Sequence, residues 1–294
     1  MDVVPPPQPD LTPLAQVAPS LQPSKRWPVL FVGHGSPVNV IEHNVWHLTW
    51  RDLGAELLQR YGRPQLILCI SAHWLTRAGW SVTGAAMPPT VHDFSGFPPE
   101  LYEVQYPAAG APLCAQELVA WLRQSCPEQK QVHIDPERGL DHGAWGVLQP
   151  MFPQADIPVL QLSMDYTASM QEHWALGQQL TALRDQGVLI VASGNIVHNL
   201  QTRRYGTGIN ATYRWALQFD DRVSNLILSG QMEPLTQCAQ WGEITELCHP
   251  TPEHFWPLLY AAATVQPGDT PRFFNAGFQM ASISMRSVLW EAGA

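Results

Sequence analysis

Three histidines that closely follow short apolar runs are the residues of this chain best placed to do chemistry. They are His34 after Val29–Val32, His73 after Leu66–Ile70, and His198 after Val188–Ala192. Each has small residues beside it, which let the backbone and a bound group approach closely. Imidazole is the commonest protein ligand for transition metals. If the three runs are neighbouring strands, these histidines form a metal site at one edge of a sheet.

A fourth candidate ligand is His254. Thr251 suits a helix N-cap and Pro252 the first helical position, so Glu253 and His254 would complete the first turn of a helix. That arrangement would hold His254 at a fixed point facing the strand ends. Any one of these histidines, taken alone, is more often a hydrogen-bonded structural residue than a ligand. The repetition of the pattern is what favours a shared site.

Two further histidines lie in expected loops. His142 follows Asp141 and precedes Gly143, which suits a general acid or base on an exposed turn, or equally a turn packed by Trp145. His92 lies near aromatic residues, either in a pocket wall or in ordinary loop packing. The other histidines have polar or helical surroundings, and we expect them at the surface or in a turn: His43, His47, His133, His173 and His249.

Apolar runs alternate with helical patterns from Trp27 onward. The expected strands are 29–32, 66–70, 159–162 and 188–192, and the expected helices are 44–61, 111–124, 169–184, 212–228 and 252–262. Continuously apolar strands separated by helices predict an α/β fold, with a largely parallel or mixed central sheet that helices cover on both faces. In such sheets ligands gather beyond the carboxyl ends of the strands.

The chain is predicted to be one domain, residues 27–294, preceded by a disordered tail, residues 1–26. The tail is expected because its prolines leave little scope for helix or sheet pairing. No internal repeat or second linker interrupts the rest of the sequence. We expect the tail to contribute nothing to catalysis.

Composition excludes several classes of function. The net charge is −9 and no run of Lys and Arg occurs, so the electrostatic footprint of a nucleic-acid partner is missing. No apolar stretch reaches the ~18 residues of a membrane span, and no secretory signal begins the chain. The five cysteines are odd in number and have no CxxC spacing, which favours a reduced, cytoplasmic protein. The sequence leaves the oligomeric state open.

Other catalytic motifs are missing from the sequence. It contains no GxSxG nucleophile elbow, no GxxxxGK[ST] phosphate loop and no HExxH zinc motif. Gly33 and Gly35 lack the third glycine of a dinucleotide fingerprint. Cys69 lies inside an apolar run, so we expect it in the core and not as a nucleophile.

Six segments together resemble a known family. They are GHGSP, SAHW, HDFSGFP, DHGAWG, ASGNIVHN and TPEHFWPLLY. In order and spacing they are similar to the 4,5-DOPA dioxygenase extradiol family of bacteria and plants, which belongs to the class III extradiol dioxygenases. The likeness runs from about Trp27 to the C-terminus. It implies that a catechol ring is opened beside its two hydroxyls by O2 at one divalent metal, giving a semialdehyde.

The resemblance also implies roles for individual residues. His34 and His73 match the two metal-ligand histidines, and His254 matches the third ligand. His198 matches a position that is acid/base in the wider superfamily and lies at or beside the metal in DOPA-type members, so it is a candidate for both roles. His142 matches a second active-site histidine, and we expect His92 to contact the substrate.

One departure from the superfamily concerns the metal. The wider group uses two His and one Glu, whereas His254 occupies the third position here and Glu253 precedes it. An all-His site also suits catalytic zinc, which has no redox chemistry. We therefore expect Fe(II) for turnover and Zn²⁺ in the isolated protein. Two alternatives remain open: a zinc-dependent hydrolase, and a non-enzymatic metal-binding relative of the same fold.

Overall fold

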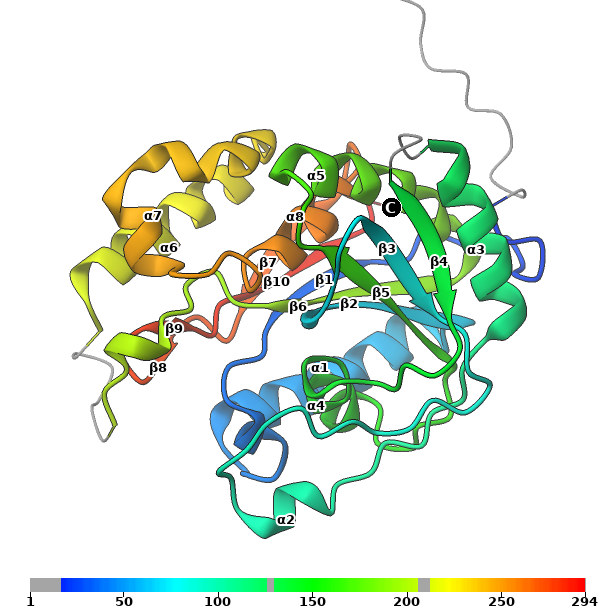
Figure 1. The fold of residues 1–294 in the computed structure, drawn as a ribbon, viewed down its shortest axis with the longest axis horizontal. Coiled ribbons are helices and arrows are strands. Elements are labelled where there is room, and N and C mark those ends of the chain that lie inside the picture. Colours follow the sequence, from blue (N-terminus) through cyan, green and yellow to red (C-terminus); the bar gives the residue numbers. More distant parts are fainter. Residues whose placement is uncertain (1–16, 126–129, 206–211, 294) are drawn as a thin grey trace, which may run out of the picture.

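The computed structural model describes residues 17–125, 130–205 and 212–293. An eight-stranded sheet forms its centre, in the order β4-β3-β5-β2-β6-β1-β10-β7 (Figure 1). Its strands are β1 Val29–Gly33, β2 Leu66–Thr76, β3 Gly79–Thr83, β4 Gln131–Asp135, β5 Val159–Asp165, β6 Val188–Gly194, β7 Thr270–Phe274 and β10 Ser287–Glu291. A separate pair consists of β8 Phe278–Gln279 and β9 Ile283–Ser284.

The sheet is mixed, as the sequence predicted. Its middle strands, β5, β2, β6 and β1, run parallel to one another. At one side β10 joins β1 antiparallel, and β7 joins β10 antiparallel. At the other side β3 is antiparallel to β5 and parallel to β4. The carboxyl ends of the middle strands therefore lie at one edge of the sheet.

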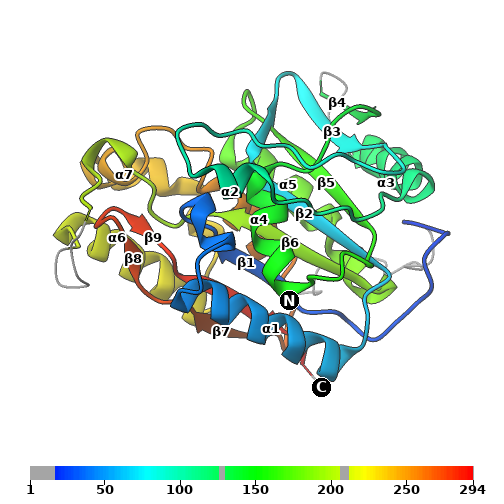
Figure 2. The same ribbon diagram turned by 90° about the horizontal axis from the view of Figure 1, so that it is seen from below.

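Helices cover both faces of the sheet. They are α1 Val45–Tyr61, α2 Pro99–Tyr102, α3 Pro112–Ser125, α4 His142–Met151, α5 Met170–Gln179, α6 Arg214–Leu228, α7 Glu243–Cys248 and α8 Trp256–Ala263. Alternate residues of β1 enter two separate cores: Val29 and Phe31 pack with α3, α5, α6 and α8, whereas Leu30 and Val32 pack with α1 and α4. From below, α1, α2 and α4 lie in front of the strands (Figure 2). This confirms the predicted α/β architecture.

Three predicted boundaries need correction. The stretch 169–184 is two elements, because α5 ends at Gln179 and a 3₁₀ helix, Thr181–Gln186, continues to the left-handed Gly187. β2 does not end at residue 70 but extends to Thr76, since it resumes pairing with β5 after a register shift. The last predicted helix begins at Trp256 and not at Pro252, with Phe255 as its N-cap.

The tail boundary predicted at Trp27 also needs correction. Val17 and Ala18 are almost completely buried in the core that contains α3 and α5. The hydroxyl of Ser20 donates to Glu117 of α3. Burying apolar side chains offsets the cost of ordering this segment, despite its prolines. The folded part of the chain thus begins no later than Val17, and residues 1–16 lie outside the described part.

Two histidines that we expected outside the core are buried. His173 was expected at the surface, but it lies on the inner side of α5, where its Nδ1 is 2.7 Å from the hydroxyl of Tyr260. The Nε2 of His249 donates to the carbonyl of Ile196 at 2.7 Å. Each ring has a protein partner at one of its two nitrogens, which offsets part of the cost of burying it. Among the described helices, none is both long and apolar enough to cross a membrane.

Candidate active site

The strand ends bring two of the candidate ligands together. Gly33 of β1 pairs with Gly194 of β6, and Ser71 of β2 pairs with Ser193 of β6. His34 directly follows β1. His73 lies within β2, beside the register shift that interrupts its pairing with β5. The parallel register of three strands therefore places both imidazoles at the same edge of the sheet.

His254 reaches the same point from a turn before α8. The backbone N–H of Asn195, just after β6, donates to the carbonyl of His254 at 2.8 Å. A Cβ on Gly194 would overlap that carbonyl oxygen and lie 3.2 Å from the carbonyl carbon. Glycine is therefore needed at position 194 for the turn to approach β6. His254 is fixed by this backbone contact, and not by the first helical turn that we predicted.

The three histidines form a compact set of possible ligands. One ring nitrogen of each of His34, His73 and His254 lies within 4.8 Å of the other two. The Nε2 atoms of His34 and His73 are 3.3 Å apart. That separation is compatible with both nitrogens binding one ion at roughly 2.0–2.1 Å.

The other ring nitrogen of each histidine faces an oxygen. The Nδ1 atoms lie 2.9 Å from Ser193 Oγ for His34, 3.6 Å from Asp93 Oδ2 for His73, and 3.0 Å from Glu253 Oε1 for His254. Such partners fix ring orientation and favour a proton on Nδ1. Each Nε2 then keeps its lone pair for a metal. Glu253 is therefore not itself one of the candidate ligands. It orients the ring of the adjacent His254.

Electrostatics keep these imidazoles neutral. Burial lowers the pKa of His34 and His254 well below the ordinary value of 6.5, and repulsion from neighbouring histidines lowers it further. Burial and then His142 lower the pKa of His73 to about 3. A neutral imidazole is the form that binds a metal.

His198 does not face the same point as these three rings. Its ring stacks on that of His254, with centroids 3.5 Å apart and planes at 5°. A ring-nitrogen lone pair lies in the ring plane, so two parallel stacked rings do not aim at one ion. Burial lowers the pKa of His198 to about 3. This arrangement leaves the ring of His198 beside the ligand set and in its neutral form.

His142 approaches from the opposite side, against His73. Their ring centroids are 3.8 Å apart. His142 is the first residue of α4 and is buried, not on the exposed turn we expected, because Asp141 caps the helix through the backbone N–H of Ala144. Its Nδ1–H and its backbone N–H both donate to Asp93, at 2.8 and 3.0 Å.

Asp93 is a residue that sequence reasoning missed. Its carboxylate faces both His142 and His73. The three residues together form a second possible set of metal ligands. Burial alone would raise the pKa of Asp93, but hydrogen bonds from the side chain and backbone of His142 lower it below the ordinary range. The available signal was its place in the HDFSGFP segment, directly after His92.

Asp141 forms a buried anchor behind the site. Its carboxylate accepts hydrogen bonds from Ser71 at 2.6 Å, Gln161 at 2.7 Å and Arg138 at 3.2 Å. Arg138 also donates to the carbonyl of His73 at 3.2 Å. Because a buried carboxylate must have its oxygens paired, this network ties α4 to β2 and β5.

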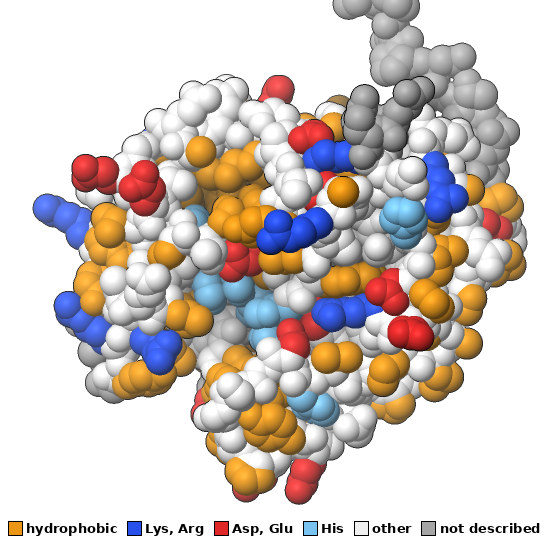
Figure 3. Space-filling model, viewed as in Figure 1, with side chains coloured by type: hydrophobic (Ala, Val, Ile, Leu, Met, Phe, Trp, Pro, Cys, Tyr) orange, Lys and Arg blue, Asp and Glu red, His pale blue; other side chains and the backbone are white. Residues whose placement is uncertain are grey.

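A cavity of about 630 Å³ opens above the histidines. Figure 3 shows histidine side chains near the centre of this face, beside a hollow. The five histidines at its floor are His34, His73, His142, His198 and His254. One wall is formed by the segment before α2, with Asp93, Phe94, Ser95, Gly96 and Phe97. The other wall is formed by the segment after β6, with Leu200, Arg203 and Tyr205, and by the β8–β9 hairpin, with Met280 and Ile283.

His92 is not one of the residues that line this cavity. Its Nε2 donates to the carbonyl of Val104 at 3.0 Å, and its ring packs on Trp145. We therefore withdraw His92 as a substrate-binding residue. Its neighbours Asp93 and Phe94 line the cavity instead.

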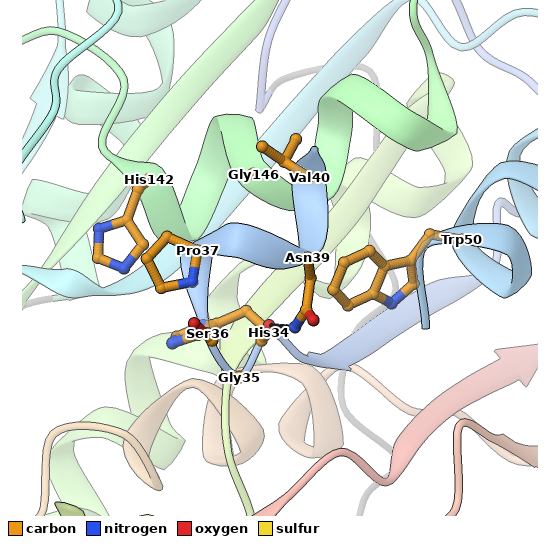
Figure 4. A pocket seen from close by; sticks show the side chains of 9 residues that line it. All are labelled: His34, Gly35, Ser36, Pro37, Asn39, Val40, Trp50, His142 and Gly146. Carbon is orange, nitrogen blue, oxygen red and sulfur yellow. Dashed lines mark hydrogen bonds between the residues drawn. The ribbon is translucent and has the colours of Figure 1, made fainter. Parts of the chain in front are cut away.

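A second, much smaller cavity lies behind His34 and His142 (Figure 4). Its volume is only about 10 Å³, close to the minimum that accommodates one water molecule. Val40 and Trp50 form part of its lining, and Gly146 of α4 leaves open space beside it. The helix is therefore loosely packed at Gly146.

Three neutral histidines at the carboxyl ends of parallel strands, under an open cavity with two more histidines, define a histidine-rich active site on an α/β fold. The family described as the catalytic LigB subunit of aromatic ring-opening dioxygenase matches residues 28–286. The chain belongs to this family, and it is an extradiol ring-cleavage dioxygenase.

Individual relatives agree with this assignment. A 4,5-DOPA dioxygenase extradiol of Escherichia coli K12 is 44% identical over 95% of this chain and 99% of its own length. The enzyme of the same name from Beta vulgaris is 37% identical over 79% of this chain and 84% of its own. A crystal structure of an uncharacterized protein from Escherichia coli K12 superposes with a TM-score of 0.75 at 41% identity, covering 90% of this chain and all of that one.

Proposed function

We propose that this dioxygenase uses O2 and one divalent metal to open the ring of a DOPA-like catechol, giving a semialdehyde. The observation that carries the proposal is the set of His34, His73 and His254, whose inner nitrogens converge while their outer nitrogens face Ser193, Asp93 and Glu253. The names of the relatives support a DOPA-like substrate.

The residues present fit such a metal. Two Nε2 lone pairs 3.3 Å apart would repel one another unless a cation or a proton lies between them, and protons held on the outer Nδ1 atoms by Ser193 and Asp93 leave that place to a cation. When bound there, a divalent ion lowers the pKa of a catechol hydroxyl, and iron also exchanges electrons with oxygen. Zinc suits the same donors without redox chemistry, so we propose Fe(II) for turnover and Zn²⁺ as a frequent occupant of the isolated protein.

Two residues of the chain are placed to move protons. His198, unprotonated and stacked on His254, accepts the proton of a substrate hydroxyl at the cavity floor. His142 holds its Nδ1 proton against Asp93, which leaves Nε2 for the substrate side. In this role Nε2 of His142 first accepts a proton from the cavity and later donates it to an oxygen of the opened ring. Phe94 and Phe97 shield the face of the ring from water.

The metal and the substrate can be tested together. The protein is stripped with a chelator and reloaded with Fe(II) or Zn²⁺, and L-DOPA and 4-methylcatechol are added with and without air. We expect a yellow semialdehyde and O2 uptake only with Fe(II) and air. Ester hydrolysis by the zinc form without catechol cleavage would replace this proposal with the hydrolase alternative. Metal binding without turnover of any kind would leave the non-enzymatic alternative.

We further propose a reducing, cytoplasmic environment and no nucleic-acid partner. Four cysteines in the described ranges, Cys69, Cys114, Cys238 and Cys248, are free and buried. Burial raises the pKa of the Cys69 thiol, so this residue is unreactive, as expected for a core position. Mass spectrometry of thiol-labelled protein from cells would test the reduced state.

A further inference from the structure

The cavity extends well beyond the reaction centre. Its volume of about 630 Å³ lies within the range of ~300–1,000 Å³ typical of sites for larger small molecules than a bare catechol. A catechol that places its two oxygens at the histidine floor points the rest of its ring toward the cavity mouth. Any substituent on the far side of the ring therefore meets the walls, and not the floor.

Arg203 is the sole Lys or Arg side chain among the described residues that line this cavity. It is exposed, and its guanidinium donates to the carbonyl of Leu200 at 3.4 Å and lies 5.9 Å from the ring centre of Tyr205. Within the described part of the chain, no carboxylate lies within ion-pair distance of it. Arg203 thus offers a positive charge to whatever occupies the cavity.

Backbone hydrogen bonds hold the segment that carries Arg203 beside the reaction centre. Asn199, which follows His198, accepts hydrogen bonds from the backbone N–H groups of Gln201 and Thr202 at 2.9 and 3.2 Å. On the other side, the N–H of Arg204 donates to the carbonyl of Met280 at 2.9 Å. Since the segment is held both before and after Arg203, the fold sets the position of its backbone relative to His198.

The other charge on the cavity wall is already compensated. Asp93 lies in the opposite wall segment, where it accepts hydrogen bonds from His142 and faces His73. Arg203 is therefore the charged group that a substrate can still pair with.

We propose that Arg203 selects catechols that carry an anionic substituent, a carboxylate, on the side of the ring away from the hydroxyls. Its planar guanidinium pairs with both oxygens of a carboxylate, and the ring of Tyr205 lies beside that pair. This inference rests on the proposed function for the position of the catechol oxygens. It adds which residue binds the substituent, and that the substituent is negatively charged.

The test compares two probes that differ only in charge: 3-(3,4-dihydroxyphenyl)propionate and its primary amide. Their dissociation constants are measured on the metal-loaded protein without oxygen, so that binding is read without turnover. The variants are Arg203→Gln, Arg203→Lys and, as a matched control, Arg51→Gln. Arg51 is an exposed arginine of α1 that does not line the cavity.

We expect Arg203→Gln to weaken binding of the acid about 10-fold, or about 1.4 kcal/mol, and to leave the amide unchanged. Arg203→Lys should retain part of the preference, and Arg51→Gln should match the wild type. Added salt should weaken binding of the acid to the wild type more than to Arg203→Gln.

Equal affinity of the wild type for acid and amide would overturn the inference. An equal loss of affinity for both probes in Arg203→Gln would also overturn it. Admitting air separates this result from the proposed function. If neither probe is cleaved but the acid still depends on Arg203, the catechol reaction is wrong and the anion site stands. If both are cleaved without a charge preference, the reaction stands and the anion site is wrong.

Discussion

Gly143 and Gly146 of α4 offer a paired test of how the fold positions His73. An added Cβ at Gly143 would lie 2.9 Å from Cδ2 of His73 and closer still to the hydroxyl of Ser71. Both distances are shorter than 3.0 Å, the shortest contact that Cβ atoms normally make. At Gly146, three residues later in the same helix, an added Cβ meets nothing within 4 Å. Alanine should therefore have opposite effects at the two positions.

The magnitudes follow from these contacts. In Gly143→Ala the Ser71 hydroxyl must move, which breaks its 2.6 Å hydrogen bond to the buried carboxylate of Asp141. Overpacking costs ~1–3 kcal/mol, and an unpaired buried group costs ~1–3 kcal/mol more. Displacing the His73 ring should also weaken metal binding by ~10–100-fold, as loss of a supporting residue does. Gly146→Ala should instead stabilise the helix by ~0.5–1 kcal/mol.

Thermal melting and a chelator competition assay measure the two effects on each variant. We expect the melting temperature of Gly143→Ala to fall by several degrees and its metal affinity to drop. For Gly146→Ala we expect a rise of about 1–4 °C at unchanged affinity. If both variants bind metal like the wild type, the contact between α4 and β2 does not position His73, and the reasoning fails.

Four further predictions follow. His198→Gln should keep its metal but lose roughly 10²–10⁴ in turnover, and a fall in metal content by elemental analysis would make His198 a ligand. Asp93→Asn should fold normally by circular dichroism yet lower kcat by about 10-fold or more, because it removes the charge beside His142; unchanged kcat would rule out this role. Removing residues 1–26 should lower the melting temperature, because Val17 is buried, and an unchanged value would restore the tail interpretation. Burial lowers the pKa of His173 to about 4 in the folded chain, so the unfolded chain takes up protons first as pH falls below 6.5. Stability should then decrease by up to roughly 3 kcal/mol between pH 6.5 and 4, and less in His173→Gln, as measured by urea unfolding.

The sequence by itself determined the main strands and the residues that end them. Apolar runs such as Val29–Val32 predict buried strands because a sheet covered on both faces has no polar side. Histidines that follow such runs come together whenever the strands are parallel neighbours, so the placement of His34 and His73 needed only that assumption. The order of six short segments was enough to indicate the family.

Only the tertiary structure decided which side chains support and complete the site. Asp93 meets His142 across 49 residues of chain, and no local pattern predicts such a contact. The stacking of His198 on His254 depends on how closely a turn approaches β6, which the missing side chain of Gly194 permits. Local sequence patterns reflect backbone preference and burial, whereas ligand geometry depends on long-range packing. The sequence therefore left open whether His198 is a ligand or a base, and its stacking on His254 favours the base.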